Sequence, residues 1–166
     1  CVRWYNAANS QADINNYHNI GDAFVYDSSL KLLNFEKLDA VRISDPNCDV
    51  DQLNREYDYV FLRGSNYIHG EMNWLNTSSI LKKLKIPVLG FGIGAQAPVK
   101  GPLQLSDDTK LVLRLMADST ESIGVRGAYT AQVLWDIGIR NARIIACPTT
   151  FRRNDPDMRI TLPPLE

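Results

Sequence analysis

The sequence has few of the residues that build disulfide scaffolds or structural metal sites. It contains three cysteines and two histidines in 166 residues, and no cysteine pair has the C-x-x-C spacing of zinc ligands or redox motifs. An odd cysteine count without paired spacing also argues against a disulfide framework. We therefore predict no metal site and no cofactor, and a reducing, cytoplasmic setting.

Long apolar runs and an excess of charge are missing as well. No stretch approaches the roughly 20 apolar residues of a membrane-spanning helix, and no signal peptide is recognised. The 18 basic and 19 acidic residues give a formal net charge of −1, so the overall charge indicates neither nucleic acid nor an anionic membrane as a partner. Any anion site must therefore be local. Peripheral contact with a membrane stays open, as does the oligomeric state.

The length fits one domain, because a domain of this size buries roughly 70% of its unfolded surface. From Phe151 onward the sequence loses its apolar period and becomes charged and rich in proline, as linkers and domain edges do. The last two residues, Leu-Glu, also resemble a cloning scar. We expect residues 1–151 to form one domain, and 152–166 to be a linker or the start of a carboxyl-terminal domain that this fragment lacks.

Apolar periodicity predicts strands that mostly alternate with helices. The first helix should begin close to Asp22, a later one is expected to be capped by Ser106, and Gly138 should end the last one. This order predicts an α/β fold with a Rossmann-like, doubly wound and mostly parallel sheet of about six strands. The predicted strands are 2–6, 38–43, 57–62, 86–89, 122–125 and 142–147, and the predicted helices are 23–33, 74–84, 107–117 and 129–137.

The most informative segment is IPVLGFGIGAQ, residues 86–96, an apolar strand that ends in glycines at alternate positions. Such glycines either bring the backbone close to a ligand or simply let the chain turn over the sheet edge. The segment lacks the G-x-G-x-x-G order of a dinucleotide site. Pro98 and Pro102 also delay the next helix, so a pyrophosphate could not sit on its amino terminus.

Polar residues follow the ends of several predicted strands. Carboxyl ends of parallel strands share one edge of a sheet, so these residues are expected to meet in a binding crevice. The candidate binding residues are Asn19, Gly21 and Asp22 after the first strand, Arg63, Gly64, Ser65 and Asn66 after the third, Gly92, Gly94 and Gln96 after the fourth, and Arg126 after the fifth.

Among these candidates, Arg63 and Arg126 are expected at the sheet rim, with guanidinium groups that fork onto a phosphate or carboxylate. The alternative is that each pairs with a protein acid such as Asp22, or that Arg126 caps backbone carbonyl groups. Residues 64–66 suit sugar hydroxyls or phosphate oxygens, and equally an ordinary turn. Asp22 is either a base or, as favoured, a helix-start carboxylate. His69 is the candidate catalytic acid or base, with a surface or structural histidine as the alternative.

The ordered set of these segments resembles the polysaccharide pyruvyl transferase family. The residues that carry the resemblance are 19–22 (NIGD), 58–66 (DYVFLRGSN), 86–96 (IPVLGFGIGAQ), 122–130 (SIGVRGAYT), 138–141 (GIRN) and 147–149 (CPT). The resemblance implies a bacterial two-domain enzyme with a glycosyltransferase-B-like arrangement, of which this chain is the amino-terminal half.

That family transfers a pyruvyl group from phosphoenolpyruvate to two hydroxyls of a sugar, forming a ketal and releasing phosphate. The resemblance therefore implies phosphoenolpyruvate and a glycan or lipid-linked sugar as partners, in exopolysaccharide or cell-surface glycan synthesis, and an isolated chain that is inactive. Two other functions stay open from the sequence: the acceptor-binding half of a nucleotide-sugar glycosyltransferase, and a binding module without catalysis.

Overall fold

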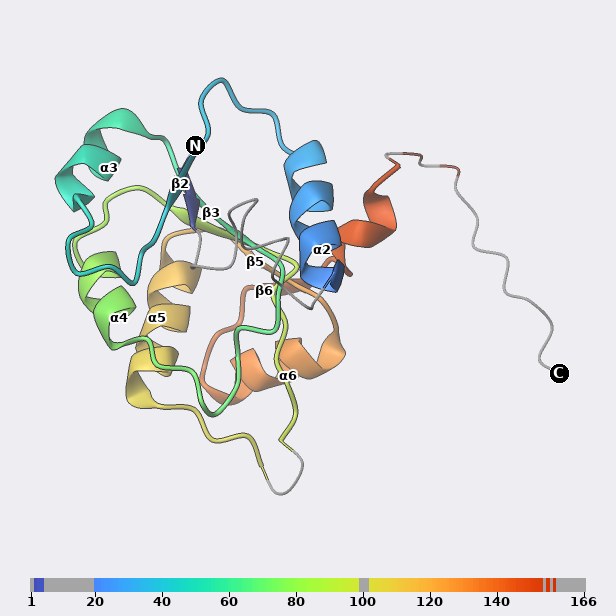
Figure 1. Ribbon diagram of the computed structural model, residues 1–166. Helices are drawn as coiled ribbons and strands as arrows, with labels where there is room; N and C mark the ends of the chain where they lie inside the picture. Colours follow the sequence, from blue (N-terminus) through green and yellow to red (C-terminus); the bar gives the residue numbers. More distant parts are fainter. Residues whose placement is uncertain (1, 5–19, 99–101, 154, 156, 158–166) are drawn as a thin grey trace, which may run out of the picture.

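The computed structural model describes residues 2–4, 20–98, 102–153, 155 and 157 as an α/β fold (Figure 1). Strands and helices mostly alternate along the chain, as the periodicity predicted. In order they are β1 (Val2–Trp4), α2 (Ile20–Lys31), β2 (Asp39–Val41), α3 (Val50–Glu56), β3 (Val60–Arg63), α4 (Leu75–Leu81), β4 (Val88–Phe91), α5 (Asp107–Asp118), β5 (Ile123–Val125), α6 (Ala128–Asp136), β6 (Ala142–Ile144) and the 3-10 turn η2 (Pro148–Phe151). Neither α3 nor η2 was predicted from the sequence.

The strands form short parallel sheets. Four strands pair in the order β2-β1-β3-β4, and β5 pairs separately with β6. The single six-stranded sheet that the sequence predicted is therefore not confirmed. The division falls at Gly92, whose φ of 71° turns the chain out of the extended conformation directly after β4. Beyond it, the bridge between Ile93 and Val125 keeps the two sheets adjacent, together with hydrogen bonds from the amides of residues 92 and 93 to the Gly124 carbonyl.

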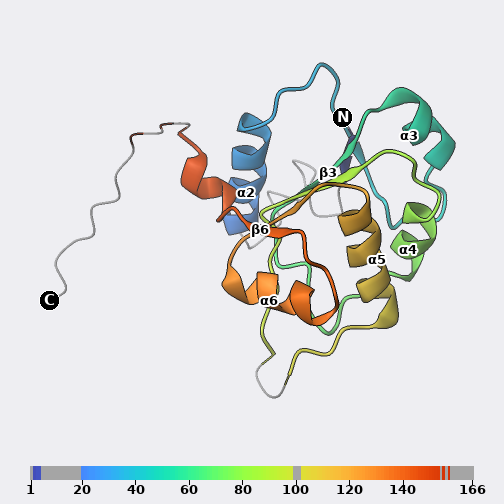
Figure 2. The same ribbon diagram turned by 180° about the vertical axis from the view of Figure 1, so that it is seen from behind.

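The core surrounds β3, which is buried along its whole length. Val60, Phe61 and Leu62 expose 2% or less of their surface, so β3 lacks the alternation of a half-exposed strand because both faces of the sheet are covered. Helices α4 and α5 lie side by side on one flank, whereas α2 packs with η2 on the other (Figures 1 and 2). This packing places the end of β3 in the middle of the molecule.

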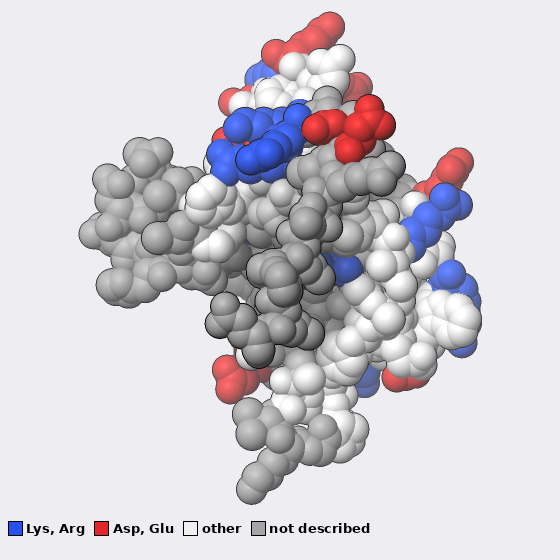
Figure 3. All heavy atoms as spheres, turned by 90° about the vertical axis from the view of Figure 1, so that its right-hand side faces the viewer, with Lys and Arg blue, Asp and Glu red and all other residues white. Residues whose placement is uncertain are grey.

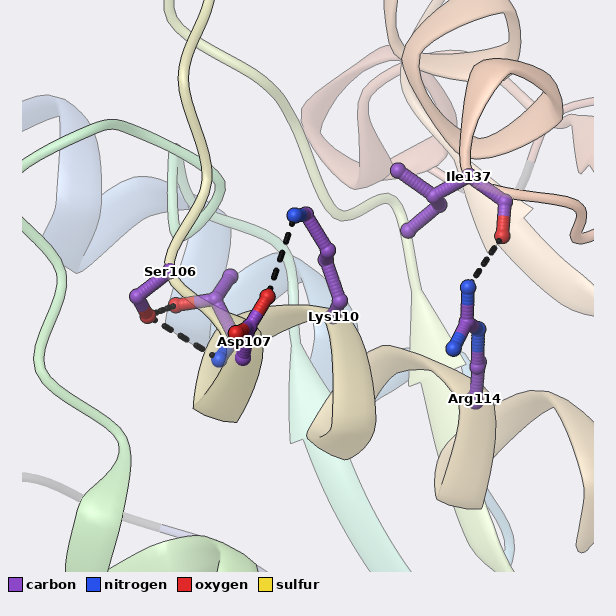
Figure 4. A network of polar contacts seen from close by, with 6 residues as sticks. Ser106, Asp107, Lys110, Arg114 and Ile137 are labelled. Atoms are coloured by element: carbon purple, nitrogen blue, oxygen red, sulfur yellow. Dashed lines mark hydrogen bonds and ion pairs between the residues drawn. The ribbon is translucent and has the colours of Figure 1, made fainter.

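Local signals at helix ends agree with the structure. The Ser106 hydroxyl accepts a hydrogen bond from the Thr109 amide at 3.2 Å, which confirms the predicted cap of α5 (Figure 4). Further along α5, Arg114 donates to the carbonyl of Ile137 at 3.1 Å and so ties α5 to the end of α6. Gly138 follows α6 with a φ of 92°, as expected of a residue just past a helix end.

Candidate functional site

Several elements meet at one surface cavity of about 640 Å³, which we call the arginine hollow. The start of α2, the loops after β3 and β4, the end of β5 and the turn η2 all contribute to it. Its described lining contains arginine as the only charged residue type. The lining residues are Gly21, Phe24, Val25, Ser65, Asn66, Gln96, Arg126, Cys147, Thr149 and Arg152. The structure thus brings together five of the predicted residues: Gly21, Ser65, Asn66, Gln96 and Arg126.

Arg126 is fixed in the arginine hollow by its backbone and by one side-chain contact. It follows β5 directly, its amide donates to the Ile93 carbonyl at 2.8 Å, and its Nη1 donates to the Asn66 Oδ1 at 3.2 Å. Its Nε is buried and has no hydrogen-bond partner among the described residues. An unsatisfied buried donor costs about 1–3 kcal/mol, so a change of the Arg126 side chain that lets an anion accept from Nε would remove this penalty.

The glycines after β4 allow neighbouring loops to pack closely. A Cβ placed on Gly92 would lie 2.6 Å from Pro148 Cδ, and one on Gly94 would lie 2.6 Å from Asn66 Oδ1. A Cβ on Gly64 would lie 2.6 Å from the Gly92 carbonyl oxygen. None of these three glycines is among the residues that line the arginine hollow. Their visible structural role is therefore close approach between segments of this chain, and a role in binding stays a prediction.

The backbone amides of this glycine loop are already used. The five consecutive amides of residues 92–96 all donate to acceptors within the protein. The acceptors are the Gly124 carbonyl for residues 92 and 93, the Ser65 carbonyl for 94, Thr130 Oγ1 for 95 and the Ile68 carbonyl for 96. Anion binding at this edge of the sheet would therefore depend on side chains and not on a cradle of these amides.

Arg63 differs from its prediction. It was expected to follow β3 with its guanidinium exposed at the sheet rim, but it is the last residue of the strand and only 6% exposed. Its Nη1 donates to the carbonyl of Gly64 at 3.1 Å. The expected exposure is therefore wrong, because the loops after β3 and β4 pack over the strand end. A role for Arg63 in substrate binding stays a prediction.

The remaining predicted residues lie elsewhere or outside the described part of the chain. His69 is half-buried and lines a neighbouring cavity of about 490 Å³ with Gly70, Glu71 and the 102–104 segment. Gln96 lines both cavities, so the two adjoin. Asn19 and the side chain of Asp22 lie outside the described residues. The catalytic role of His69 stays a prediction.

Sequence reasoning placed residues 147–150 at the end of the sixth strand, on the edge of the sheet where ligands gather, but assigned them no binding role and predicted no turn there. Cys147, Thr149 and Arg152 line the arginine hollow, but Arg152 was assigned to the linker because its surroundings are charged and rich in proline. The signal that could have found it was Pro148, which occupies the first position of η2 directly after the last strand segment. Phe24 of α2 was read only as part of an apolar helix face, yet it is 47% exposed at the hollow.

Other classes of site are not evident in the described part of the chain. No three His, Cys, Asp or Glu side chains there are grouped so that they could hold a metal ion. The thiols of Cys48 and Cys147 are unpaired, and Cys1 lies outside the described residues. Among the helices that the structure describes, none combines the length and apolar character needed to cross a membrane.

Comparison of the sequence with known protein families identifies one match. The family model described as polysaccharide pyruvyl transferase matches residues 19–162, which is most of the 166 residues. Searches of curated proteins and of solved structures gave no match. The matched region contains β2 to β6 together with every described residue of the arginine hollow. The chain therefore belongs to the polysaccharide pyruvyl transferase family.

Proposed function

We propose that this chain forms the donor-binding wall of a bacterial pyruvyl transferase. The enzyme would move a pyruvyl group from phosphoenolpyruvate to a sugar as a ketal, in the synthesis of exopolysaccharide or another cell-surface glycan. The observation that carries this proposal is Arg126, a cation that lines a cavity without acidic described residues and whose buried Nε has no partner among the described residues. Phosphoenolpyruvate carries a phosphate and a carboxylate, and a guanidinium suits both.

The neutral polar residues of the arginine hollow fit the acceptor part of such a reaction. Asn66 and Gln96 are exposed amides at its edge, and Ser65 adds a hydroxyl group. Amide and hydroxyl side chains both donate and accept hydrogen bonds, as sugar hydroxyls require. We therefore place the transferred pyruvyl group near Arg126 and the glycan or lipid-linked sugar acceptor toward Gln96.

Ketal formation requires balanced proton transfers. An acid adds a proton to the methylene carbon of phosphoenolpyruvate, and one sugar hydroxyl attacks the adjacent carbon while it loses its proton to a base. The second hydroxyl then displaces phosphate, which carries away the remaining proton. His69 is our candidate for one of these transfers, because its cavity adjoins the arginine hollow at Gln96.

We further propose that residues 1–151 form the Rossmann-like half of a glycosyltransferase-B-like enzyme. Residues 152–166 would then lead into a second half that closes over the arginine hollow. The hollow is lined by residues of α2, the strand ends and η2. Figure 3 shows the right-hand face of the view in Figure 1, on which basic and acidic side chains lie near one another. Catalytic crevices are commonly built between domains because both walls are needed to exclude water and orient substrates. We also propose that the enzyme acts on its substrates in the cytoplasm.

The test is pyruvyl transfer by the natural full-length protein from phosphoenolpyruvate to a glycan acceptor, followed by phosphate release and by the ketal methyl signal in NMR. Arg126→Gln should lower kcat/KM about 100-fold, as expected for loss of a charge-assisted contact to a reacting group. Arg143→Gln is the matched control, since Arg143 lies exposed on β6. Full activity in Arg126→Gln, or transfer only from a nucleotide sugar, would contradict the proposal.

A further inference from the structure

A second arginine, Arg152, also lines the arginine hollow, although it lies near the carboxyl end of the described residues. It follows η2, and its guanidinium lies 4.8 Å from the centre of the Phe24 ring. Its Nη2 lies 2.7 Å from Asp27 Oδ2, one turn further along α2. The turn η2 and α2 pack against each other in the views of Figures 1 and 2. Arg152 is therefore held at the hollow by two residues of one helix.

The contact with Asp27 does not cancel the positive charge beside the hollow, because Asp27 contacts two cations. Asp27 Oδ2 also lies 3.1 Å from the Lys31 ammonium, so one carboxylate is shared between two cations. That oxygen accepts no well-directed hydrogen bond among the described residues, which makes its contact with Arg152 a charge contact. One carboxylate balances only one of these two cations, so the group of Asp27, Lys31 and Arg152 keeps one net positive charge, and no acidic residue lines the described hollow.

The form of the site favours two separate anionic groups over a diphosphate. Diphosphates are commonly bound by free amides of a glycine loop, but the amides of residues 92–96 all donate within the protein. What remains is a pair of guanidinium forks with the apolar side chains of Phe24 and Val25 along the same wall. Guanidinium groups bind carboxylate and phosphate in a planar, two-pronged way.

We infer that Arg152 is a second anion-binding residue, which together with Arg126 holds the phosphate and the carboxylate of phosphoenolpyruvate. This inference rests on the proposed function, because that function names the donor. It extends the binding site beyond the last strand to the end of η2 and to Arg152, which the sequence assigned to a linker. Phe24 then has a defined task, since its ring supports the guanidinium from α2.

Calorimetric titration of the natural full-length protein with phosphoenolpyruvate tests this inference. Arg152→Gln should raise the dissociation constant about tenfold, equivalent to about 1.4 kcal/mol, and should raise KM with little change in kcat. Arg152→Lys should recover part of the affinity because it restores the charge. The matched control is Arg153→Gln, which removes a charge from the adjacent exposed residue. Equal affinity in Arg152→Gln and Arg153→Gln would overturn the inference.

Two further measurements test the identity of the anion and the place where it binds. Titration with pyruvate and with UDP distinguishes sources of anionic groups: we expect both to bind more weakly than phosphoenolpyruvate, and tighter binding of UDP would overturn the assignment. If Arg152→Gln does not fold, the Nε–H signal of Arg152 in the unmodified protein must shift in NMR when phosphoenolpyruvate is added. An unshifted signal would overturn the inference equally.

Failure of the Arg152 inference can be distinguished from failure of the proposed function. If phosphoenolpyruvate binds in an Arg152-dependent way but no ketal forms with any acceptor, the proposed function fails and the anion site stands. If ketal forms with unchanged KM in Arg152→Gln, the function stands and the role of Arg152 fails. Asp27→Asn adds a structural check, because a purely structural role for Arg152 predicts that Asp27→Asn raises KM as much as Arg152→Gln does.

Discussion

The glycines after β4 show how one missing side chain can serve different purposes. Gly92 has a φ of 71°, a conformation that strains any residue with a Cβ, and the Cβ would also press on the Pro148 ring. Gly94 has only the amide oxygen of Asn66 in the way, and this oxygen can move. The first glycine is thus required by the backbone, and the second positions a neighbouring side chain.

We therefore expect one of two similar substitutions to affect mainly stability and the other to affect mainly binding. Gly92→Ala should lower the free energy of unfolding by about 1–3 kcal/mol, the usual cost of a strained backbone position. Gly94→Ala should change the free energy of unfolding by less than about 1 kcal/mol. It should nevertheless weaken phosphoenolpyruvate binding, because the added methyl group displaces Asn66 Oδ1, which accepts a hydrogen bond from Arg126 Nη1. Urea unfolding and calorimetric titration measure the two effects.

Gly127→Ala is the control for this pair. Gly127 has an extended backbone, and a Cβ there would meet no atom within 4 Å. It also lies next to Arg126, so it tests whether any added methyl group near the hollow disturbs binding. Equal loss of binding in Gly127→Ala and Gly94→Ala would show that the Asn66 contact is not the cause.

At the level of elements, β2 is joined to the end of α3 by a small polar cluster. The Tyr57 hydroxyl donates to Asp39, and the Lys37 ammonium lies 3.5 Å from Asp39, 3.4 Å from Glu56 and 4.7 Å from the centre of the Tyr57 ring. The Tyr57 hydrogen bond lowers the pKa of Asp39 below its ordinary 3.8. The same contact raises the pKa of Tyr57, and the contacts with Tyr57 and Glu56 raise that of Lys37.

These directions predict the pH range in which the cluster stabilises the fold. Asp39 contributes stability above its unfolded pKa, and this contribution is lost as the pH falls through the lower folded value. Tyr57 and Lys37 contribute below their unfolded values of 10.0 and 10.5, and the contribution is lost as the pH rises through the higher folded values. The cluster therefore acts fully between these limits.

Tyr57→Phe is the test, because it removes the hydroxyl that shifts Asp39. The variant should lose less stability than the unmodified protein when the pH is lowered from about 5 to about 2, measured by urea unfolding at each pH. The effect should be small because the groups are exposed. Glu121→Gln, at an exposed loop position, is the control. An unchanged acid slope in Tyr57→Phe would contradict the assignment.

Elements with local signals could be predicted from the sequence. Helix α5 has an amphipathic pattern and the Ser106 cap, and its predicted start at residue 107 agrees with the structure. Helix α3 was missed because it is only seven residues long and buries only Leu53. Its signal was present in Asp49, whose side chain accepts from the Gln52 amide at 2.8 Å. The break in regular pairing between β4 and β5, where Gly92 has a φ of 71°, was not predicted from the sequence.

The candidate site follows the same division. Arg126 could be found because an apolar strand followed directly by arginine places the side chain at a sheet edge. The burial of Arg63 and the use of the loop amides could not, because both result from packing between the loops after β3 and β4. Arg152 reaches the arginine hollow only because η2 packs on α2, a contact between opposite ends of the described chain.

Across the whole molecule, the arginine hollow joins parts that no regular sheet pairing connects. It is shared by α2, the loop after β3, the end of β5 and η2, so it draws on segments of both sheets, which adjoin through the bridge between Ile93 and Val125 and the backbone hydrogen bonds beside it. A ligand that binds the hollow would therefore add contacts between the two sheets. It would stabilise the assembled state by mass action, in proportion to its affinity and concentration.

Hydrogen exchange with and without phosphoenolpyruvate measures this connection. We expect slower exchange in α2, at the end of β5 and in η2, and unchanged exchange in α3 and α4, which lie on the other flank (Figure 1). In Arg126→Gln the protection should disappear from all three responding segments together, because they respond through one ligand. Protection confined to one segment, or protection that persists in Arg126→Gln, would show that the ligand binds outside the hollow and does not couple the two sheets.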